Sequence, residues 1–310
     1  MTHEIAVLGI FAADAAFRSA RLPQRGETIL GDSFALSPGG KGSNQAIAAA
    51  RAGAKVAMLT RIGTDSFGDM ALSTWAQAGV SFKGTQTPDH PTGAAFIHVD
   101  SATGDNAIIV APGAAGQISP ADIDDWSKTI RAAKIFMCQL EQPLDAACHA
   151  LEIARSAGVT TILNPAPAAS LPPDMLSFCD FVTPNETEAE SLTGCPVTTV
   201  EEAEFAAREL IRLGAGAAII TLGDRGALYS SGNSQVYVSA LTAGPVVETT
   251  GAGDAFNGGL ATALAEGRNI SEALRFANAT AAISVTRSGA ASSMPDRYET
   301  DSLLASPKSN

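Results

Sequence analysis

The sequence has few charged residues, few aromatic residues and only four cysteines among 310 residues. Charged residues make up 17% of the chain and aromatic residues 5%, while hydrophobic residues make up 45%. This balance excludes an intrinsically disordered chain and is typical of a globular protein with a large buried core. The cysteines (Cys138, Cys148, Cys179 and Cys195) lack CxxC and zinc-ligand spacing, so we expect reduced thiols in a cytoplasmic protein.

Basic residues are also scarce, and long apolar runs are missing. The 20 Lys and Arg residues against 32 Asp and Glu give a net charge of −12, which argues against sequence-independent binding of nucleic acid. No apolar run reaches the length of a membrane span, and a strand pattern starts at Glu4 without a basic segment before it. These features predict a soluble protein that binds neither nucleic acid nor a membrane.

Much of the chain alternates between short apolar strands and helices, as α/β proteins with a parallel sheet do. The strand patterns are nearly continuous runs of apolar residues, which is typical of strands buried on both faces. Polar residues follow strand after strand, at the end where open parallel sheets bind ligands. The predicted strands are 5–9, 56–60, 135–140, 160–163, 181–183 and 217–222, and the predicted helices include 68–78 and 144–157.

Two turn-rich segments interrupt this alternation. Residues 17–36 have a mixed pattern that fits no helix, and residues 94–99 and 106–110 alternate around a turn, which predicts a β-hairpin. We expect these segments to form one small sheet over the site. This lid, about residues 12–36 and 92–112, would be inserted in a single domain of residues 1–305, with residues 306–310 as a tail.

The first glycine cluster, residues 37–45, opens an alanine-rich helix that ends near Gly53. Its glycines permit close approach of the backbone to a ligand, while Lys41 and Asn44 supply a charge and an amide. It is not a Walker A loop, because Gly42 follows Lys41 where Ser or Thr is required. An ordinary glycine turn with a solvated lysine is the alternative interpretation.

A second glycine cluster precedes another helical pattern, 255–265. Gly251 and Gly253 flank one small residue, and Asp254 follows them. Backbone N–H groups at such a helix start can converge on an anion. A carboxylate is unfavourable there unless it takes a proton, which predicts phosphoryl transfer to a hydroxyl with Asp254 as the base. From this stretch alone, Asp254 could equally be only a helix N-cap.

Six motifs in order resemble those of the ribokinase-like (PfkB) carbohydrate kinases. Residues 39–45 and 248–258 resemble the two family signatures, and residues 164–167, 183–188, 221–223 and 284–290 are similar to further family motifs. The resemblance covers nearly the whole chain, from Val7 to about Pro295. It implies a three-layer α/β/α fold with a mostly parallel sheet and a small β-sheet lid. The implied activity is transfer of phosphate from ATP to the primary hydroxyl of a pentose, with D-ribose the first candidate.

The resemblance also implies roles for the matching residues. Asp254 would take the hydroxyl proton, and the backbone of Gly251, Ala252 and Gly253 would hold the developing charge. Together with Asp254, the residues expected to hold the sugar are Asp14, Gly40, Lys41, Asn44 and Glu141. Those expected to bind ATP, with Mg²⁺ near the first two, are Asn185, Glu188, Thr221, Gly223, Gly226, Gly253 and Asn278. A monovalent cation, expected to be K⁺, would be held by Glu248, Thr250, Ser284, Arg287, Gly289 and Ser293.

Two positions depart from the family pattern and keep alternatives open. Ala12 stands where relatives usually carry Asn, which favours weaker ribose binding or a sugar lacking one hydroxyl, such as 2-deoxyribose. Glu248 stands where Asp is usual, which leaves activation by K⁺ open. A kinase for a nucleoside or another small sugar, and a non-catalytic sugar or nucleotide sensor, are further alternatives. Lids of relatives pair, so the resemblance also implies a homodimer through the lid.

Overall fold

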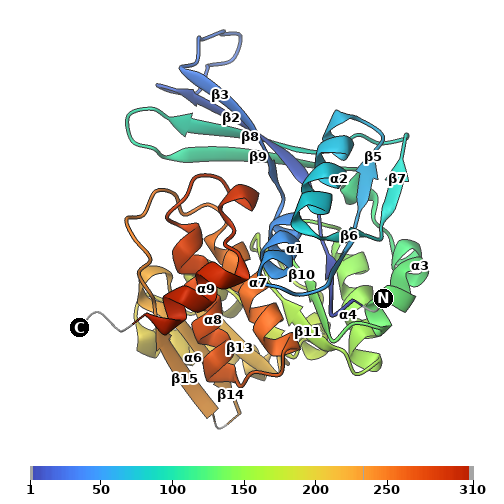
Figure 1. Cartoon of the computed structure of the whole chain (residues 1–310), viewed down its shortest axis with the longest axis vertical. Coiled ribbons are helices and arrows are strands. Elements are labelled where there is room, and N and C mark those ends of the chain that lie inside the picture. The colour runs from blue at the N-terminus through green and yellow to red at the C-terminus, as the bar shows by residue number, and fades with distance from the viewer. Residues whose placement is uncertain (1–2, 233, 307–310) are drawn as a thin grey trace.

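The computed structural model describes residues 3–232 and 234–306, and a nine-stranded sheet lies at the centre of this part of the chain (Figure 1). The strand order is β15-β14-β13-β12-β11-β10-β1-β4-β6. All neighbours from β6 to β13 pair in parallel, whereas β14 and β15 are antiparallel additions at one edge. The strands are β1 (Ile5–Leu8), β4 (Val56–Leu59), β6 (Ser81–Phe82), β10 (Ile135–Cys138), β11 (Thr160–Leu163), β12 (Phe181–Val182), β13 (Ala217–Thr221), β14 (Gly226–Ser231) and β15 (Ser234–Ser239).

Helices cover both faces of this sheet and give the chain three layers. Within β1, Ala6 and Leu8 pack against one helical layer, and Ile5 and Val7 pack against the other. Burial on both faces explains why the strand sequences are continuously apolar. The first layer contains α3 (Pro120–Arg131), α4 (Leu144–Ser156), α5 (Glu186–Thr193) and α6 (Val200–Arg212); the second contains α1 (Lys41–Arg51), α2 (Ser66–Ala78), α7 (Ala252–Ala265), α8 (Ile270–Ser284) and α9 (Arg297–Ala305). The predicted three-layer fold is confirmed.

A small four-stranded sheet projects from this body (Figure 1). Its order is β3-β2-β8-β9, with β2 parallel to β8 and the two outer pairs antiparallel. The strands are β2 (Ala12–Ser19), β3 (Ser33–Gly39), β8 (Thr92–Asp100) and β9 (Asn106–Gly113), and a separate pair is formed by β5 (Arg61–Gly63) and β7 (Thr85–Thr87). The segments predicted to make one small sheet therefore do so. Short 3₁₀ helices are η1 (Ala114–Gln117), η2 (Met175–Phe178), η3 (Gly223–Arg225) and η4 (Ala291–Ser293).

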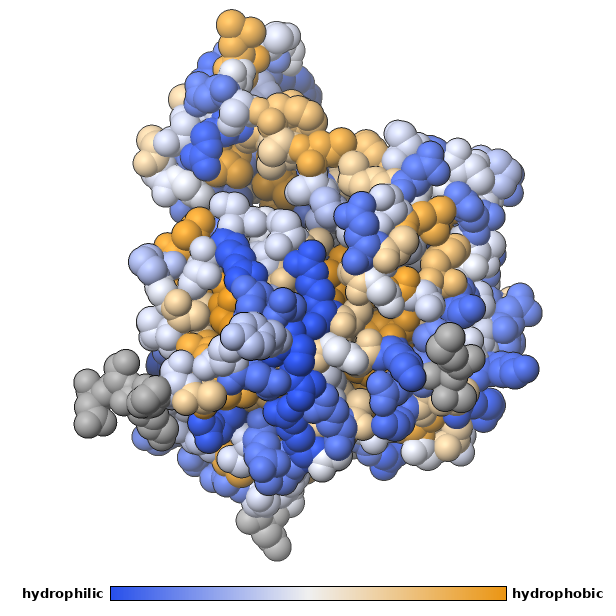
Figure 2. Space-filling model, viewed as in Figure 1, coloured by the Kyte–Doolittle hydropathy of each residue, from blue (hydrophilic) through white to orange (hydrophobic). Residues whose placement is uncertain are grey.

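Apolar side chains remain exposed on the small sheet (Figure 2). On the face turned away from Asp14, the ring of Phe17 lies 4.9 Å from that of Phe34 and 5.8 Å from that of Phe96, measured between centroids. Phe34 is 57% exposed and Ile109 68% exposed. Aromatic pairs of this kind normally stabilise a buried core or an interface.

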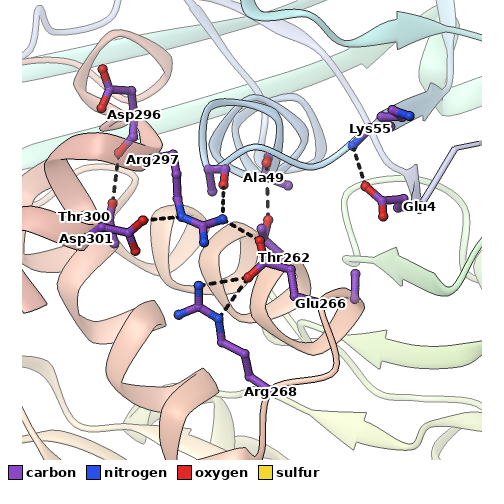
Figure 3. A network of polar contacts seen from close by, with 12 residues as sticks. Glu4, Ala49, Lys55, Thr262, Glu266, Arg268, Asp296, Arg297, Thr300 and Asp301 are labelled. Carbon is purple, nitrogen blue, oxygen red and sulfur yellow. Dashed lines mark hydrogen bonds and ion pairs between the residues drawn. The ribbon is translucent and has the colours of Figure 1, made fainter.

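Polar contacts fix α9 to the adjacent helices (Figure 3). Arg297 on α9 pairs with Glu266 at the end of α7 and, through Nε, with Asp301 Oδ2 at 2.6 Å. Arg268 Nε also donates to Glu266 Oε2 at 2.9 Å, and the guanidinium groups of Arg268 and Arg297 lie 4.6 and 5.3 Å from the Phe276 ring centroid. The C-terminal helix is thereby held against α7 and α8.

Several predicted boundaries need correction. The strand expected at 135–140 ends at Cys138, and the helix expected from Ala255 begins at Ala252. Gly251 is the N-cap, with a φ of 79° that favours glycine, so the helix can begin three residues earlier than the apolar pattern indicates. The predicted tail is residues 306–310, and all of it beyond Ser306 lies outside the described residues. Among the described residues, no helix has the length and apolar character needed to cross a membrane.

Candidate active site

Helix α1 begins in direct backbone contact with the end of β1. A Cβ on Gly9 would lie 2.7 Å from Gly42 Cα, and one on Gly40 would lie 2.7 Å from the Ile10 carbonyl oxygen. Gly40 also has a φ of 88°, which disfavours other residues. The first glycine cluster thus places the start of α1, with Lys41 and Asn44, at the carboxyl edge of the sheet.

Helix α7 lies equally close to α1. A Cβ on Gly258 would lie 2.8 Å from the carbonyl oxygen of Gln45, so only glycine permits this approach. Thr262 Oγ1 donates to the Ala49 carbonyl at 3.2 Å and joins the same two helices further along (Figure 3). The long-range contact brings Asp254, on the first turn of α7, against the side chains of α1.

The Asp254 carboxylate is held by two amides of α1. Its Oδ2 accepts from Asn44 Nδ2 and its Oδ1 from Gln45 Nε2, both at 2.9 Å, and the residue is 7% exposed. Because Gly251 is the N-cap of α7, the alternative that Asp254 serves only as an N-cap is wrong. Burial raises the pKa of Asp254, while the Lys41 charge and the two amide donors act in the opposite direction.

Three further carboxylates gather around Lys41. Glu141 Oε2 accepts from the Lys41 backbone N–H at 2.8 Å. Burial raises the pKa of Glu141 to about 7 and that of Asp14 to about 6. It also raises the pKa of Glu188. Burial alone would lower the pKa of Lys41, but the surrounding carboxylates outweigh it and raise that pKa. Gly39 makes this arrangement possible, since a Cβ there would overlap the Asp14 carboxylate.

Three cavities border the segment 246–254. A cavity of about 620 Å³ lies between the small sheet and the body, and Asp14, Glu248 and Thr250 line it. The central cavity, about 160 Å³, is lined by Lys41 and Asp254 among others, and a mostly apolar cavity of about 320 Å³ follows. Thr249 borders all three. Asp254 itself lines the central cavity.

The predicted nucleotide residues occupy the last two cavities, with one exception. Asn185, Glu188, Thr221 and Gly253 line the central cavity, and Gly223 and Asn278 line the apolar one. Gly226 lines none of the three; it begins β14, where a Cβ would overlap the Val238 carbonyl.

Two of these residues form a capping box, which sequence reasoning did not anticipate. Asn185 Oδ1 accepts from Glu188 N at 2.8 Å, and Glu188 Oε2 accepts from Asn185 N at 2.9 Å. The pair thus starts α5 as well as facing the cavity. Asn278 likewise has a structural contact, because its Nδ2 donates to the carbonyls of Val238 and Ser239 at 3.1 and 3.2 Å.

The segments predicted to hold a monovalent cation lie side by side. Glu248 Oε2 accepts from Gly289 N at 2.9 Å, and Thr250 and Gly289 line the same cavity as Glu248. The side chains of the other three predicted ligands point to protein partners: Ser284 to Ala281 O, Ser293 to Ala290 O, and Arg287 to Glu299. Within the described ranges, no cluster of three or more His, Cys, Asp or Glu residues has metal-binding geometry.

Residues outside the predicted set complete the surroundings of Asp254. Gln45 contacts the carboxylate directly, and Gln139 and Asn164 contact Gln45. Gln45 directly follows the predicted Asn44, and Gln139 is a polar residue directly after an apolar strand. Neither signal identifies the partner, which lies 94 residues away for Gln45 and Gln139 and 209 residues away for Gln45 and Asp254.

Comparison with known proteins decides the family. A model of the pfkB family of carbohydrate kinases matches residues 2–297. The chain belongs to this family. Members of the pfkB family are carbohydrate kinases, so the protein is a phosphotransferase that acts on a sugar hydroxyl, as the motifs predicted.

Several relatives are similar to this pfkB family member over almost its whole length. It is 41% identical to the ribokinase of Haemophilus influenzae, covering 98% of this chain and 99% of the relative. It is 37% identical to the deoxyribokinase of Salmonella typhi, covering 97% and 99%. The structure of Arabidopsis thaliana ribokinase complexed with ribose and ATP has a TM-score of 0.93 at 33% identity, covering 99% of this chain and 100% of that one.

Proposed function

We propose that this protein is an ATP-dependent kinase that phosphorylates the primary hydroxyl of D-ribose and forms D-ribose 5-phosphate. The observation that carries the proposal is the position of Asp254, a buried carboxylate that lines the central cavity together with Lys41 and accepts from two amides of α1. The ribokinase relatives, and the ribose and ATP bound to the Arabidopsis protein, support the choice of substrates.

In the proposed reaction, Asp254 accepts the proton of the sugar hydroxyl as its oxygen attacks the γ-phosphorus. A phosphorus–oxygen bond forms to the sugar, and the bond to ADP breaks. Gly251 is the N-cap of α7, and the N–H groups of Gly253 and Asp254 precede the first intrahelical donor, Ala255, so they could stabilise the transferred group in the central cavity that both residues line. The Ala252 N–H already donates to the Thr249 carbonyl at 3.1 Å. Lys41, which lines the same cavity, adds a positive charge.

The sugar would lie in the wide cavity. Asp14, which lines that cavity, would offer a carboxylate to its hydroxyls. Glu141 beside Lys41 and Asn44 beside Asp254, which line none of the three cavities, would supply a second carboxylate and an amide oxygen. Asn44 Oδ1 is buried without a protein partner, which suits a hydroxyl donor from the substrate. The mostly apolar cavity beside Gly223 and Asn278 would take the adenine of ATP.

Cations are part of the proposal. The carboxylate of Glu188 and the amide oxygen of Asn185 are hard oxygen donors that fit Mg²⁺, which would neutralise phosphate charge. For K⁺, the Glu248 carboxylate and nearby carbonyls are the donors. We expect K⁺ to accelerate turnover, and unchanged rates after replacing K⁺ by choline would contradict this assignment.

A coupled ATP assay over a panel of sugars and nucleosides tests the function. Turnover is expected with ribose, and absence of turnover with every compound would contradict the kinase proposal. 2-Deoxyribose is the second candidate, because the buried Ala12 offers no polar atom beside Asp14. A higher kcat/KM for 2-deoxyribose than for ribose would replace the first candidate by the second.

We further propose a homodimer through the small sheet in the cytoplasm. Its exposed aromatic face would be covered by a second copy, since unpaired apolar strands favour association. All four cysteines are free thiols in the structure, which supports a reducing compartment. Light scattering measures the molar mass in solution and so tests the homodimer.

A further inference from the structure

A ring of hydrogen bonds, partly on the wall of the central cavity, connects Asp254 with Gln45 and with the ends of β11 and β12. Gln45 Nε2 donates to Asp254 Oδ1 at 2.9 Å and to Asn164 Oδ1 at 3.0 Å, and Gln45 Oε1 accepts from Gln139 Nε2 at 2.6 Å. Gln45 and Gln139 are both 0% exposed. Gln45 lines none of the three cavities, and both its amide nitrogen and its amide oxygen are bonded to protein side chains, so we expect it to act on a ligand through Asp254.

The backbone determines which way the Gln45 amide points. Asn164 Nδ2 donates to the carbonyl of Thr183 at 2.9 Å, and that carbonyl can only accept. The Asn164 side-chain oxygen therefore faces Gln45, and Gln45 must donate to it through its NH₂ group. The same NH₂ group reaches the Asp254 carboxylate. The ends of β11 and β12 thus fix the donor that Asp254 receives.

The ring closes at the first turn of α7. Thr183 Oγ1 donates to Asn257 Oδ1 at 2.6 Å, and Asn257 Nδ2 donates to the Gly253 carbonyl at 2.8 Å. Gly253 directly precedes Asp254. One ring of side chains therefore holds both the carboxylate and the backbone proposed to bind the transferred phosphate.

We propose that Gln45 is a positioning residue whose amide, at Oδ1, acts together with the Asn44 amide, at Oδ2, to hold the Asp254 carboxylate in the orientation in which it accepts the substrate proton. This inference rests on the proposed function, because it assumes that Asp254 is the base. Without the Gln45 amide, the buried carboxylate can rotate about its side-chain bonds, and productive alignment with the hydroxyl is lost. Binding of sugar and ATP uses other groups and is retained.

The test is Gln45→Met, which keeps the length of the side chain and removes the amide. One hydrogen bond to a charged group predicts a fall in kcat of about tenfold or more, with both KM values within about twofold of wild type. The matched control is Gln142→Met. Gln142 is also buried and contacts the Gln139 carbonyl, away from Asp254, so its kcat should stay within about twofold.

Two further variants separate positioning from a general loss of structure. Gln139→Met leaves both amide donors on Asp254 and frees only the Gln45 oxygen, so a smaller fall of about threefold in kcat is expected. If Gln45→Met does not fold, Gln139→Met takes its place as the test variant. In an Asp254→Ala background, Gln45→Met should cause no further loss of residual activity, because its effect passes through the carboxylate.

Wild-type kcat in Gln45→Met, a loss equal to that of Gln142→Met, or an additive loss in the Asp254→Ala background would overturn the inference. These results differ from failure of the proposed function itself. In that case the wild-type protein would phosphorylate no sugar at all.

Discussion

The two sides of the proposed active site are built in opposite ways. On the body side, Asp254 is 7% exposed and receives amide donors from a helix in backbone contact with its own. On the other side, β3 and β9 are largely exposed and carry apolar residues such as Ile109 into solvent. Of the residues predicted to hold the sugar, the small sheet supplies Asp14. We therefore expect the body to supply the base and the small sheet to contribute to sugar affinity, through Asp14, and to assembly.

The largest expected effect lies in the body. Asp254→Ala removes the proposed base, and general base catalysis contributes about 10²- to 10⁴-fold, so kcat should fall by about that factor. Steady-state kinetics with ribose and ATP measures it, with the exposed Asp125→Ala as the control. If Asp254→Ala retains the kcat of wild type, the assignment of the catalytic base to Asp254 in the body is wrong.

Asp14→Asn should show the contrasting behaviour of the small sheet. It removes a charged hydrogen-bond acceptor from the sugar side, and the KM for ribose should rise about tenfold or more. The fall in kcat should be smaller than that of Asp254→Ala by at least about tenfold. Equal losses of kcat in the two variants would mean that the sheet takes part in the chemistry.

Phe34→Asp should weaken the proposed dimer. Phe34 is 57% exposed beside Phe17, and a charge in an apolar interface is unfavourable. Light scattering over a concentration series should show a shift toward the monomer. Phe205→Asp is the matched control, since Phe205 is 49% exposed on α6, in the body. If the molar mass of Phe34→Asp in solution equals that of wild type, the small sheet is not part of the interface.

The smallest expected effect is the pH dependence that Glu141 gives to stability. Its pKa is raised from 4.5 to about 7, so its contribution is fully present below the unfolded value and is lost as the pH rises through about 7. Between about pH 5 and pH 8, the unfolding temperature of the ligand-free protein should therefore fall more in wild type than in Glu141→Gln. Thermal denaturation measures this, with the exposed Glu201→Gln as the control; equal falls would contradict it.

Local patterns were sufficient to predict the main elements of the fold. Continuous apolar runs predicted the parallel strands, and the glycine clusters predicted the starts of α1 and, within three residues, α7. Residue types near strand ends also singled out Asp14, which lines the wide cavity, and Glu141, which contacts the Lys41 backbone. In each case the responsible contacts lie within a few residues, or follow from parallel pairing alone.

The support of the site could not be predicted in the same way. Gln45 meets Asp254 across 209 residues of sequence, and only the close crossing at Gly258 brings them together. The double use of Asn185 and Glu188, as a cap and as cavity walls, likewise needs the position of α5 against the sheet. Sequence spacing specifies neither packing distance nor the direction in which an amide points.

Thr249 has a consequence for the energetics of ligand binding. One residue borders the three cavities proposed for the sugar, the phosphates and adenine, so a ligand in any of them would contact a wall shared with the other two. Sugar and nucleotide affinities are then expected to be linked, and thermodynamic reciprocity requires each ligand to change the affinity of the other by the same factor. The short segment before Asp254 would thus couple occupancy of the two substrate sites.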